Sequence, residues 1–470
     1  MPPRTVGRDL TQGPLARNLF AVAWPVMVSS LLQTLYNLAD AFWLGKIGKS
    51  ALVAPTVTMQ ISFVAFAVAM GLGMGGSTLV SQYKGAGRPS EVARAGGQTL
   101  SLLTVAGIAV ALIGMALAGP LLRVLQTPAD AFRGTLVFLR WILVGVPFTF
   151  IFFVYSGIST GLGDTLAPLR INLITVVLNA VIDPILIFGL GPLPAMGVGG
   201  AAFATCLCQV ISAFLGLQRL RRGDSGFPLR RADLRWNREM ATRILKIGIP
   251  MSLGQAGTAL GFTVLIGVVN TFGSAVTAAF GVGNRIINMA MVPAMGLSQA
   301  CGAAVGQCLG AGRPDRAARA VWIGARMLTA ILLPITVLTF FFGAPISRAF
   351  INDPEVVQYG RDLFQITSFS VFAFGFVLVL LGAFRGSGHT LPVMVLNIAR
   401  LWVLRVPGAW LLAKTLRMGP TGIWWAMFFS NTLVAIAAAI WFATGSWKRS
   451  VIEPQAAEAA ALEPALVVDD

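Results

Sequence analysis

The sequence contains little charge. Only 11% of its 470 residues are charged and 56% are hydrophobic, whereas about a quarter of the residues in ordinary soluble domains are charged. This composition excludes a water-soluble globular protein. Acids are scarcer than bases, with 18 Asp and Glu against 35 Lys and Arg, so the formal net charge is +17. Because the basic residues lie in short links between long apolar runs, we attribute the excess to membrane topology and expect no nucleic-acid partner.

Cysteine and histidine are also rare. The four cysteines lie inside apolar segments, which excludes a disulfide framework and a zinc knuckle and favours packing thiols. The single histidine, His389, lies in a Gly-Ser-Gly-His-Thr stretch that is typical of a turn. The chain has no HExxH motif, nucleophile elbow or Walker loop. We therefore predict that it is not an enzyme and that it has no cofactor and no resident metal ion.

Long apolar runs dominate what is present. A membrane-spanning helix needs about 20 apolar residues, and twelve segments reach this length. The first is too long for a cleavable signal and lacks a small-residue cleavage site, so it should remain as a span. The sequence thus predicts an all-α integral membrane protein with twelve transmembrane helices. The segments are residues 19–41, 52–80, 97–119, 134–157, 168–190, 195–218, 244–270, 276–308, 319–342, 362–384, 391–413 and 420–443.

Basic residues are distributed unequally between the two sides of the predicted membrane. If the amino terminus is cytoplasmic, 22 Lys and Arg residues of the links, termini and adjoining segment ends fall on the cytoplasmic side and 8 on the other. The positive-inside rule therefore places both termini in the cytoplasm. We expect a multi-pass protein of the cell inner (plasma) membrane that acts as a monomer, with the lipid bilayer and small-molecule substrates as its partners.

The chain contains an internal repeat. A Gly-Ala-Gly-Arg-Pro stretch at 85–89 recurs at 310–314, an offset of 225 residues (310 minus 85), and the same offset relates many other positions without a gap. This register predicts two homologous six-helix bundles of the same orientation, and transporters commonly place the substrate site between such repeats. The expected parts are a cytoplasmic N-terminal segment (1–16), an N-terminal lobe (17–218), a cytoplasmic linker (219–243), a C-terminal lobe (244–445) and a disordered cytoplasmic tail (446–470).

Two acids break the apolar pattern. Of the 18 acidic residues, only Asp40 and Asp183 lie well inside apolar segments. A carboxylate at membrane depth costs roughly 2.5–3.5 kcal/mol on insertion scales, so each one marks a candidate functional site. Polar residues recur beside them at helical spacings of three and four, and these side chains should line one polar cavity. The predicted substrate-binding residues are Gln33, Tyr36, Asn37, Asn172, Asn179 and Gln209.

A close pair of buried carboxyl groups can hold a proton and release it when water enters. The sequence therefore predicts an ion-coupling site formed by Asp40 and Asp183. Asn37, Asn179 and Thr205 can hydrogen-bond the protonated form. The set Asp40, Asn179, Asp183 and Thr205 could instead offer oxygens to Na⁺. In the alternative interpretation these residues form helix-to-helix hydrogen bonds, worth about 1 kcal/mol each, that only hold the bundle together.

The second half lacks both acids, because the repeat pairs them with Leu265 and Gly408. It carries arginines inside its segments instead, which either bind an anionic substrate group or serve the structure. These residues are Arg285, Arg400 and Arg405.

A proline lies at matching positions of the first segment of each half, Pro25 and Pro250. Proline in a membrane helix frees a backbone carbonyl and permits a bend. We expect Pro25 to be a hinge that moves Asp40; a static kink is the alternative.

These motifs together resemble the multidrug and toxic compound extrusion (MATE) family and, within it, the DinF-like branch. The resemblance covers about residues 15–445. It rests on Tyr-Asn-Leu-Ala-Asp at 36–40, the repeated Gly-Ala-Gly-Arg-Pro turns, Gly-Ile-Ser-Thr-Gly-Leu-Gly-Asp-Thr at 157–165 and Leu-Asn-Ala-Val-Ile-Asp-Pro at 178–184. The resemblance implies a two-lobe antiporter of the MOP superfamily that exports organic cations or other amphiphiles in exchange for H⁺ or Na⁺.

The resemblance also implies where coupling occurs. The DinF-like branch has its coupling residues in the N-terminal lobe, and the NorM-like branch uses acids in segments 7 and 10. This chain departs from the NorM-like pattern, with Gln255 in segment 7 and no acid within 369–384. We expect H⁺ rather than Na⁺. The alternatives are a flippase of lipids or lipid-linked precursors from the same superfamily, and a membrane enzyme or non-transporting receptor. The positions that match the DinF-like coupling residues are Asp40, Asn179, Asp183 and Thr205.

Overall fold

The chain is almost entirely helical. The computed structural model describes residues 7–189, 194–224 and 226–452, and these ranges contain helices and no strand. The first half consists of α1 (Leu15–Ile47), α2 (Val53–Gly85), α3 (Pro89–Val124), α4 (Ala129–Gly161), α5 (Leu166–Phe188) and α6 (Val198–Arg222). The second half consists of α7 (Arg238–Asn270), α8 (Ser274–Gly310), α9 (Pro314–Phe350), α10 (Pro354–Ser387), α11 (Leu391–Ile398), α12 (Val406–Trp410) and α13 (Pro420–Ala443).

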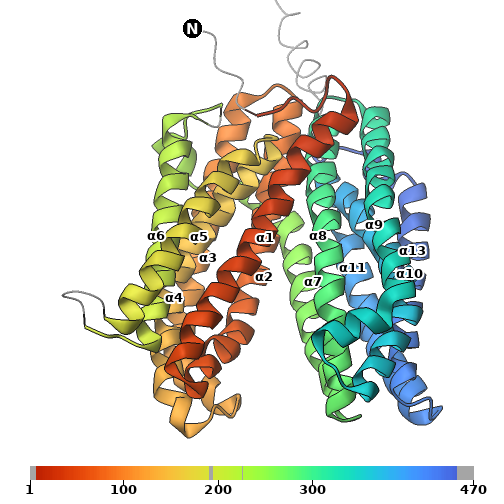
Figure 1. Ribbon diagram of the computed structural model, residues 1–470. Coiled ribbons are helices and arrows are strands. Elements are labelled where there is room, and N and C mark those ends of the chain that lie inside the picture. Colours follow the sequence, from red (N-terminus) through yellow and green to blue (C-terminus); the bar gives the residue numbers. More distant parts are fainter. Residues whose placement is uncertain (1–6, 190–193, 225, 453–470) are drawn as a thin grey trace, which may run out of the picture.

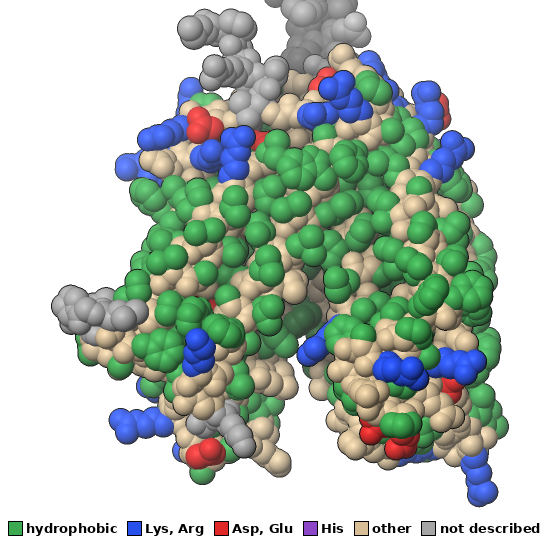
Figure 2. Space-filling view, in the orientation of Figure 1, with side chains coloured by type: hydrophobic (Ala, Val, Ile, Leu, Met, Phe, Trp, Pro, Cys, Tyr) green, Lys and Arg blue, Asp and Glu red, His purple; other side chains and the backbone are tan. Residues whose placement is uncertain are grey.

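The helices have the length and surface of membrane spans. Among the described residues, eleven are long and apolar enough to cross a membrane, or twelve if the bent pair Val53–Phe63 and Ala65–Gly85 within α2 counts as one span. α11 and α12 belong to a single span, Leu391–Thr415, because π-helical turns continue the helix. Hydrophobic side chains cover the middle of the surface in Figure 2, and Lys and Arg gather toward its two ends. The predicted all-α, multi-pass membrane class is confirmed.

The two halves follow the same path. Figure 1 shows α1–α6 on one side and α7–α13 on the other. α2 ends at Gly85 and α8 at Gly310, and α5 and α11 also begin 225 residues apart. The turns that follow α2 and α8 place Gly87 and Gly312 in the left-handed region, with φ of 71° and 68°, which glycine adopts without steric cost. The repeated Gly-Ala-Gly-Arg-Pro motif is thus a turn that ends a helix.

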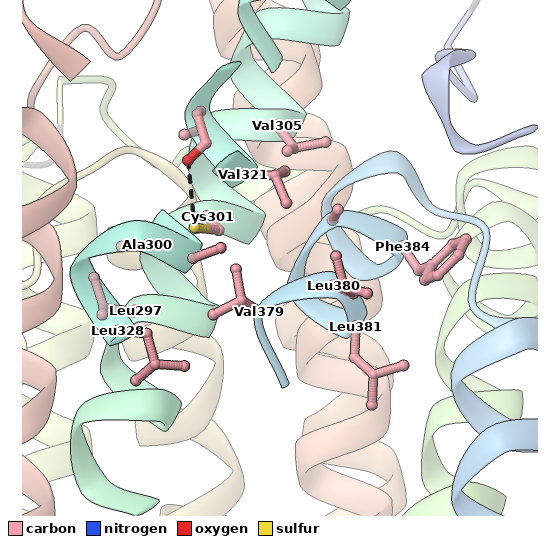
Figure 3. Packing of buried hydrophobic residues seen from close by; sticks show 14 of the residues in the cluster. Leu297, Ala300, Cys301, Val305, Val321, Leu328, Val379, Leu380, Leu381 and Phe384 are labelled. Carbon is pink, nitrogen blue, oxygen red and sulfur yellow. Dashed lines mark hydrogen bonds between the residues drawn. The ribbon is translucent and has the colours of Figure 1, made fainter. Parts of the chain in front are cut away.

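Apolar side chains fill the interior of each half. Figure 3 shows this packing in the second half, where Val305, Val321, Leu328 and Leu381 belong to one buried cluster. Cys301 lies in the same cluster, and its thiol donates a weak hydrogen bond to the Ala320 carbonyl at 3.9 Å. All four cysteines are buried and unpaired. They are packing thiols, as predicted.

The two halves meet closely near the chain termini. The end of α2 presses against the end of α8 there. A methyl group at Gly85 would overlap the carbonyl oxygen of Gln307, and a methyl group at Gly310 would overlap that of Gln82. We call these four residues the terminal seal. Because each half contributes the same two residues, the seal has two-fold pseudosymmetry.

Hydrogen bonds reinforce the terminal seal. The side-chain amides of Gln82 and Gln307 donate to backbone carbonyls of the opposite half at 3.0 and 2.9 Å. Their side-chain oxygens accept from the chain ends: Leu10 N–H donates to Gln307 at 3.0 Å and Val451 N–H to Gln82 at 3.1 Å. Both ends of the described chain therefore help to close this face of the molecule.

The expectation of a disordered tail from residue 446 is wrong for its first residues. Trp447 is fully buried, its ring stacks on Phe442 at 4.7 Å, and its indole N–H donates to the Phe442 carbonyl at 3.0 Å. Burial of the indole and the hydrogen bond from Val451 hold residues 446–452 against the protein. Residues 453–470 lie outside the described residues.

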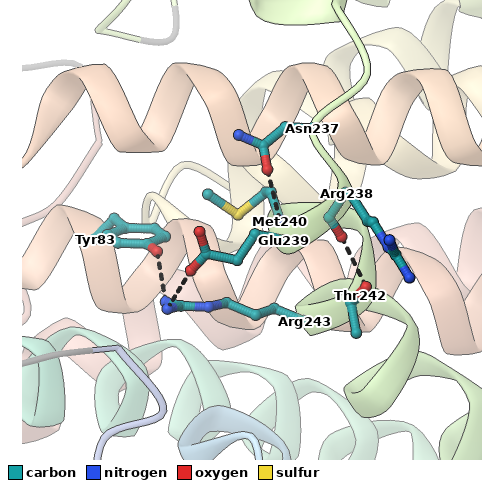
Figure 4. Close-up of polar contacts among 7 residues, drawn as sticks. All are labelled: Tyr83, Asn237, Arg238, Glu239, Met240, Thr242 and Arg243. Carbon is teal, nitrogen blue, oxygen red and sulfur yellow. Dashed lines mark hydrogen bonds and ion pairs between the residues drawn. The ribbon is translucent and has the colours of Figure 1, made fainter.

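The link between the halves also packs on the protein. The Gln98 side chain of α3 accepts from Asn237 N–H at 3.0 Å. α7 begins at this point because Asn237 caps it, accepting from Met240 N–H at 3.0 Å. Figure 4 shows this cap and the nearby Arg243, which donates to the hydroxyl of Tyr83 on α2 at 3.3 Å. The start of α7 is therefore tied to the first half.

The Gly85→Ala substitution should destabilise the protein. The added methyl group would overlap the Gln307 carbonyl, and extra atoms in a close-packed site cost about 1–3 kcal/mol. We expect a lower melting temperature for the detergent-purified protein. Gly267→Ala in α7 is the control, since its methyl group would meet no atom within 4 Å. Equal melting temperatures for the two variants would contradict the close crossing.

Candidate functional site

The two acids inside the membrane spans lie together in the first half. Asp40 is on α1 and Asp183 on α5, and their carboxyl groups are within hydrogen-bonding reach of each other. Asp183 is fully buried and Asp40 is half-buried. An ionised carboxylate can only accept hydrogen bonds, so the two groups can bond only when one of them carries a proton. The geometry therefore suits a pair that shares a proton.

Side chains one helical turn away complete the site. Asn179 precedes Asp183 on α5 and donates to it at 3.0 Å. Tyr36 precedes Asp40 on α1 and donates through its hydroxyl to Thr205 of α6 at 3.0 Å. Residues four apart lie above one another on a helix face, which is why the polar spacing in the sequence becomes one cluster. We call Tyr36, Asp40, Asn179, Asp183 and Thr205 the carboxyl cluster.

Three buried oxygens of the carboxyl cluster have no hydrogen-bond partner. They are Oδ1 of Asp40, Oδ1 of Asn179 and Oδ2 of Asp183. Leaving such oxygens unsatisfied costs free energy, and a proton or a small cation would supply the missing partner. Carboxylate and amide oxygens are also ligands that hard cations prefer. The cluster can therefore exchange a proton or hold a small hard cation such as Na⁺.

Other predicted site residues lie outside the carboxyl cluster. Gln33 and Asn37 are exposed on α1, where the Gln33 amide donates to the Asn37 side-chain oxygen at 3.4 Å. Asn172 is half-buried on α5, about two turns before the cluster. Gln209 lies one turn beyond the cluster on α6, with its side-chain oxygen buried, unpaired and close to Gly145. Their predicted role in substrate binding remains a prediction.

The predicted hinge, Pro25, lies inside α1, which is not interrupted there. α1 is helical on both sides of Pro25. The hydroxyl of Thr165 donates to the Val22 carbonyl in the preceding turn at 2.9 Å. The same arrangement recurs before Pro250, where the Thr390 hydroxyl donates to the matching carbonyl at 2.7 Å. A hydrogen bond from outside the helix thus supports the turn before each proline.

Buried arginines in the second half contact polar side chains of α13. Arg405 donates to Ser430 at 2.9 Å, and both Arg400 and Arg405 donate to the side-chain oxygen of Asn431. The Arg400 guanidinium also lies 3.9 Å from the centre of the Phe374 ring. These contacts connect the π-helical part of the α11 span to its neighbours. Ser430 and Asn431 are absent from the predicted residues. Two adjacent polar residues inside an apolar segment indicate a buried polar contact, so the sequence contained a signal for them.

A cavity of about 170 Å³ lies between the two halves, lined by α2, α4, α8 and α10. Arg385 of α10 lines it and donates to Ser298 of α8 at 2.8 Å. Arg385 is absent from the predicted site residues. The repeat contained a signal for it, because the matching position of the first half is the uncharged Thr160. Arg285, whose role the sequence left open, is exposed and has no side-chain hydrogen bond or ion pair with a described residue.

These features define a class of protein. Two repeated halves of the same orientation, with a cavity between them and polar residues at membrane depth, are typical of a secondary transporter. A family model described as MatE matches residues 25–185 and 250–411, and so covers most of each half. The chain belongs to the MatE family of membrane transporters. Membership of a family of transport proteins confirms that it is not an enzyme, and it implies small-molecule substrates.

Similar proteins span nearly the whole chain. The chain is 31% identical over 442 residues to the probable multidrug resistance protein YpnP of Bacillus subtilis, covering 94% of this chain and 97% of that protein. It is 27% identical over 413 residues to the probable multidrug resistance protein YoeA of the same species, covering 87% and 88%. A solved structure described as "MATE in the bent conformation" matches with a TM-score of 0.88 at 24% identity, covering 95% of this chain and 98% of that one. That structure confirms the fold.

Removing the hydrogen bond between α1 and α6 should cost stability. Tyr36→Phe deletes the donor to Thr205, and an interhelical hydrogen bond in a membrane protein is worth about 0.6–1 kcal/mol. Thr205→Val removes the same hydrogen bond. In the double variant, the loss of stability should therefore be smaller than the sum of the losses in the two single variants. Melting of the detergent-purified protein measures this. Thr34→Val is the control, since its hydroxyl bonds only to its own helix; strict additivity in the double variant would refute the bond.

Proposed function

We propose that this protein is a secondary active multidrug exporter of the DinF-like type, which exchanges organic cations or amphiphilic compounds for H⁺ by alternating access. The two Bacillus subtilis relatives support the substrate class, since both are described as probable multidrug resistance proteins. The carboxyl pair of Asp40 and Asp183 carries the coupling part of the proposal. A pair of acids at membrane depth costs free energy, and acids in such positions commonly mark ion pathways and proton relays.

A proton fits the pair better than Na⁺. Direct contact between two carboxyl groups requires a proton, whereas a Na⁺ ion bound between them favours both groups in the ionised state. One charge moved through 100 mV is worth about 2.3 kcal/mol. For exchange of one proton against an uncharged amphiphile, that energy supports a substrate concentration ratio of roughly 50. Exchange of one proton against a monovalent cation moves no net charge, so the pH difference drives it, by a factor of about ten per pH unit.

Coupling is confined to the first half in this proposal. The repeat places Leu265, which is fully buried, where the first half has Asp40, and Gly408 where it has Asp183. The second half therefore cannot repeat the proton chemistry of the first. We assign it to substrate binding and to the rigid-body motion of alternating access.

The state of the molecule agrees with an exporter that has opened outward. Figure 2 shows the space between the halves open at the end away from the chain termini, while the terminal seal closes the other end. With both termini in the cytoplasm, as the basic residues predict, the open end faces outside. Protons reach Asp40 and Asp183 from that side, α1 bends, and the substrate leaves. Return requires the terminal seal to part.

Aromatic and sulfur-containing side chains next to the central cavity suit amphiphilic substrates. Phe153 lines the cavity, and its ring contacts that of Phe66 edge-on at 5.0 Å. Met70 and Met74 line the same cavity. Methionine adapts its shape to different apolar groups, and aromatic rings offer a large apolar surface. This part of the lining supports lipophilic groups of varied shape as parts of the substrates.

Asp40→Asn and Asp183→Asn should each abolish export driven by a pH gradient. An amide cannot take up and release a proton in the physiological pH range. The pH gradient therefore no longer drives the transport cycle. In proteoliposomes we expect the efflux rate to fall at least about tenfold, while substrate binding is retained. Asp130→Asn, exposed in the first turn of α4, is the matched control.

The same vesicles identify the coupling ion. A pH gradient without Na⁺ should drive export by the wild-type protein, and a Na⁺ gradient at equal pH should not. The opposite result would show that Na⁺ is the coupling ion and H⁺ is not. If both Asn variants export as fast as the Asp130→Asn control under the pH gradient, the carboxyl pair is not the coupling site.

Pro25→Ala should slow export several-fold. Alanine restores the missing backbone N–H and removes the proline ring that favours a bend. α1 then resists the bending that moves Asp40 during the export cycle. Pro250→Ala stiffens the matching helix of the second half, which has no coupling acid, and should have a smaller effect. Initial efflux rates in proteoliposomes measure both. Equal rates for the two variants would show that Pro25 is a static kink.

A further inference from the structure

The cavity between the halves has the composition of an anion site. Its lining comes from α2, α4, α8 and α10 and includes no member of the carboxyl cluster. Among the described residues, no acid lines it and Arg385 is its one charged lining residue. The rest of the polar lining consists of serine and threonine hydroxyls and one side-chain amide. Cations therefore find no counter-charge here, whereas an anion does.

Arg385 brings a positive charge without a carboxylate partner. Its guanidinium donates to Ser298 at 2.8 Å, to the Leu381 carbonyl at 3.2 Å and weakly to the sulfur of Met74 at 3.9 Å. Within the part of the chain that the structure describes, no Asp or Glu forms an ion pair with it. A guanidinium has five N–H donors, so two remain for a ligand. Arg385 is half-buried, and a partly desolvated cation without a counter-ion is costly, a cost that a bound anion would relieve.

Unused hydrogen-bond donors surround this charge. Ser77 of α2 and both Ser156 and Thr160 of α4 line the cavity, and their hydroxyls form no hydrogen bond with other described residues. The Gln299 side chain of α8 lines it as well, and its amide is equally unused. Together with Arg385, these donors come from four helices of both halves. Charge-assisted hydrogen bonds from several directions are the means by which proteins bind oxyanions.

We propose that this cavity binds an oxyanion, namely a carboxylate or a sulfate- or phosphate-type group, on Arg385 and the surrounding hydroxyls. A volume of about 170 Å³ accommodates such a group with water beside it, because one water molecule occupies about 30 Å³ in the liquid. The oxyanion is either a free ion or the anionic group of a transported amphiphile. Only the second source rests on the proposed function.

The position of the cavity gives the ligand a mechanical effect. Its donors belong to both halves, so a bound anion connects α2 and α4 to α8 and α10. Ser81 also lines the cavity and is a neighbour of Gln82 in the terminal seal. A ligand that binds one arrangement of the halves more tightly shifts the population toward it. An oxyanion therefore stabilises the state in which the terminal seal is closed.

Direct binding tests the free ion. Full-length protein in detergent is equilibrated with radiolabelled inorganic sulfate, and bound label is measured for the wild type and for Arg385→Gln, Arg385→Lys and Arg361→Gln. We expect Arg385→Gln to weaken binding at least about tenfold, and Arg385→Lys to restore part of it. Arg361→Gln removes an exposed charge from the other end of α10 and should leave binding unchanged.

Transport selectivity tests the substrate source. Efflux of a rhodamine dye with a free carboxyl group is compared with efflux of its methyl ester, which differs only at that group. If the anion belongs to the substrate, Arg385→Gln lowers efflux of the acid at least about tenfold relative to the ester. Continued efflux of the ester shows that the proposed transport function survives even where the anion site fails.

The proposal is overturned if sulfate does not bind the wild type and folded Arg385→Gln leaves the ratio of acid to ester unchanged. Size-exclusion chromatography establishes whether that variant is folded. If it is not, the Ser77→Ala/Ser156→Ala double variant keeps Arg385 and removes two of the unused donors. That variant should weaken sulfate binding or acid efflux several-fold, and no change in either would equally overturn the site.

Discussion

Close contact between α2 and α8 at the terminal seal is the constraint on which the other features depend. Membrane helices gain little from hydrophobic burial against each other, so their association rests on close packing and hydrogen bonds. Gly85 and Gly310 allow the two helices to touch, and Gln82 and Gln307 bond backbone carbonyls across the junction. Since this contact holds the halves together near the termini, they can separate at the opposite end and leave the space seen in Figure 2.

The spans and the carboxyl pair could be predicted because the bilayer requires long apolar segments and makes charged residues within them costly. A span needs a minimum apolar length, and an acid inside such a span is rare enough to stand out. Asp40 and Asp183 were visible for this reason. The helical spacing could not show which edge of a polar stripe faces the protein, so Gln33 and Asn37 were grouped with the pair although they are exposed.

Arg385 and Trp447 were missed for the opposite reason, because each looks ordinary in its immediate sequence context. A basic residue at the end of a span is typical of the cytoplasmic side, and only the contacts between α10 and the other half show that Arg385 lines a cavity. Trp447 lies just before a segment rich in Ala, Glu and Pro, which suggested disorder. Its burial depends on Phe442 and on the end of the chain returning to Gln82.

The two halves share a backbone path but differ in the sign of their buried charge. The first half holds the carboxyl pair, and the second holds the buried Arg400 and Arg405 and the half-buried Arg385, without an acidic partner among the residues described. Electrostatic forces act strongly where water is excluded, so this difference makes the two halves unequal neighbours for any charged group between them. In the export cycle that we propose, protonation changes the charge of the first half alone. The halves then share the backbone symmetry that permits a rigid-body motion, while proton uptake acts on only one of them.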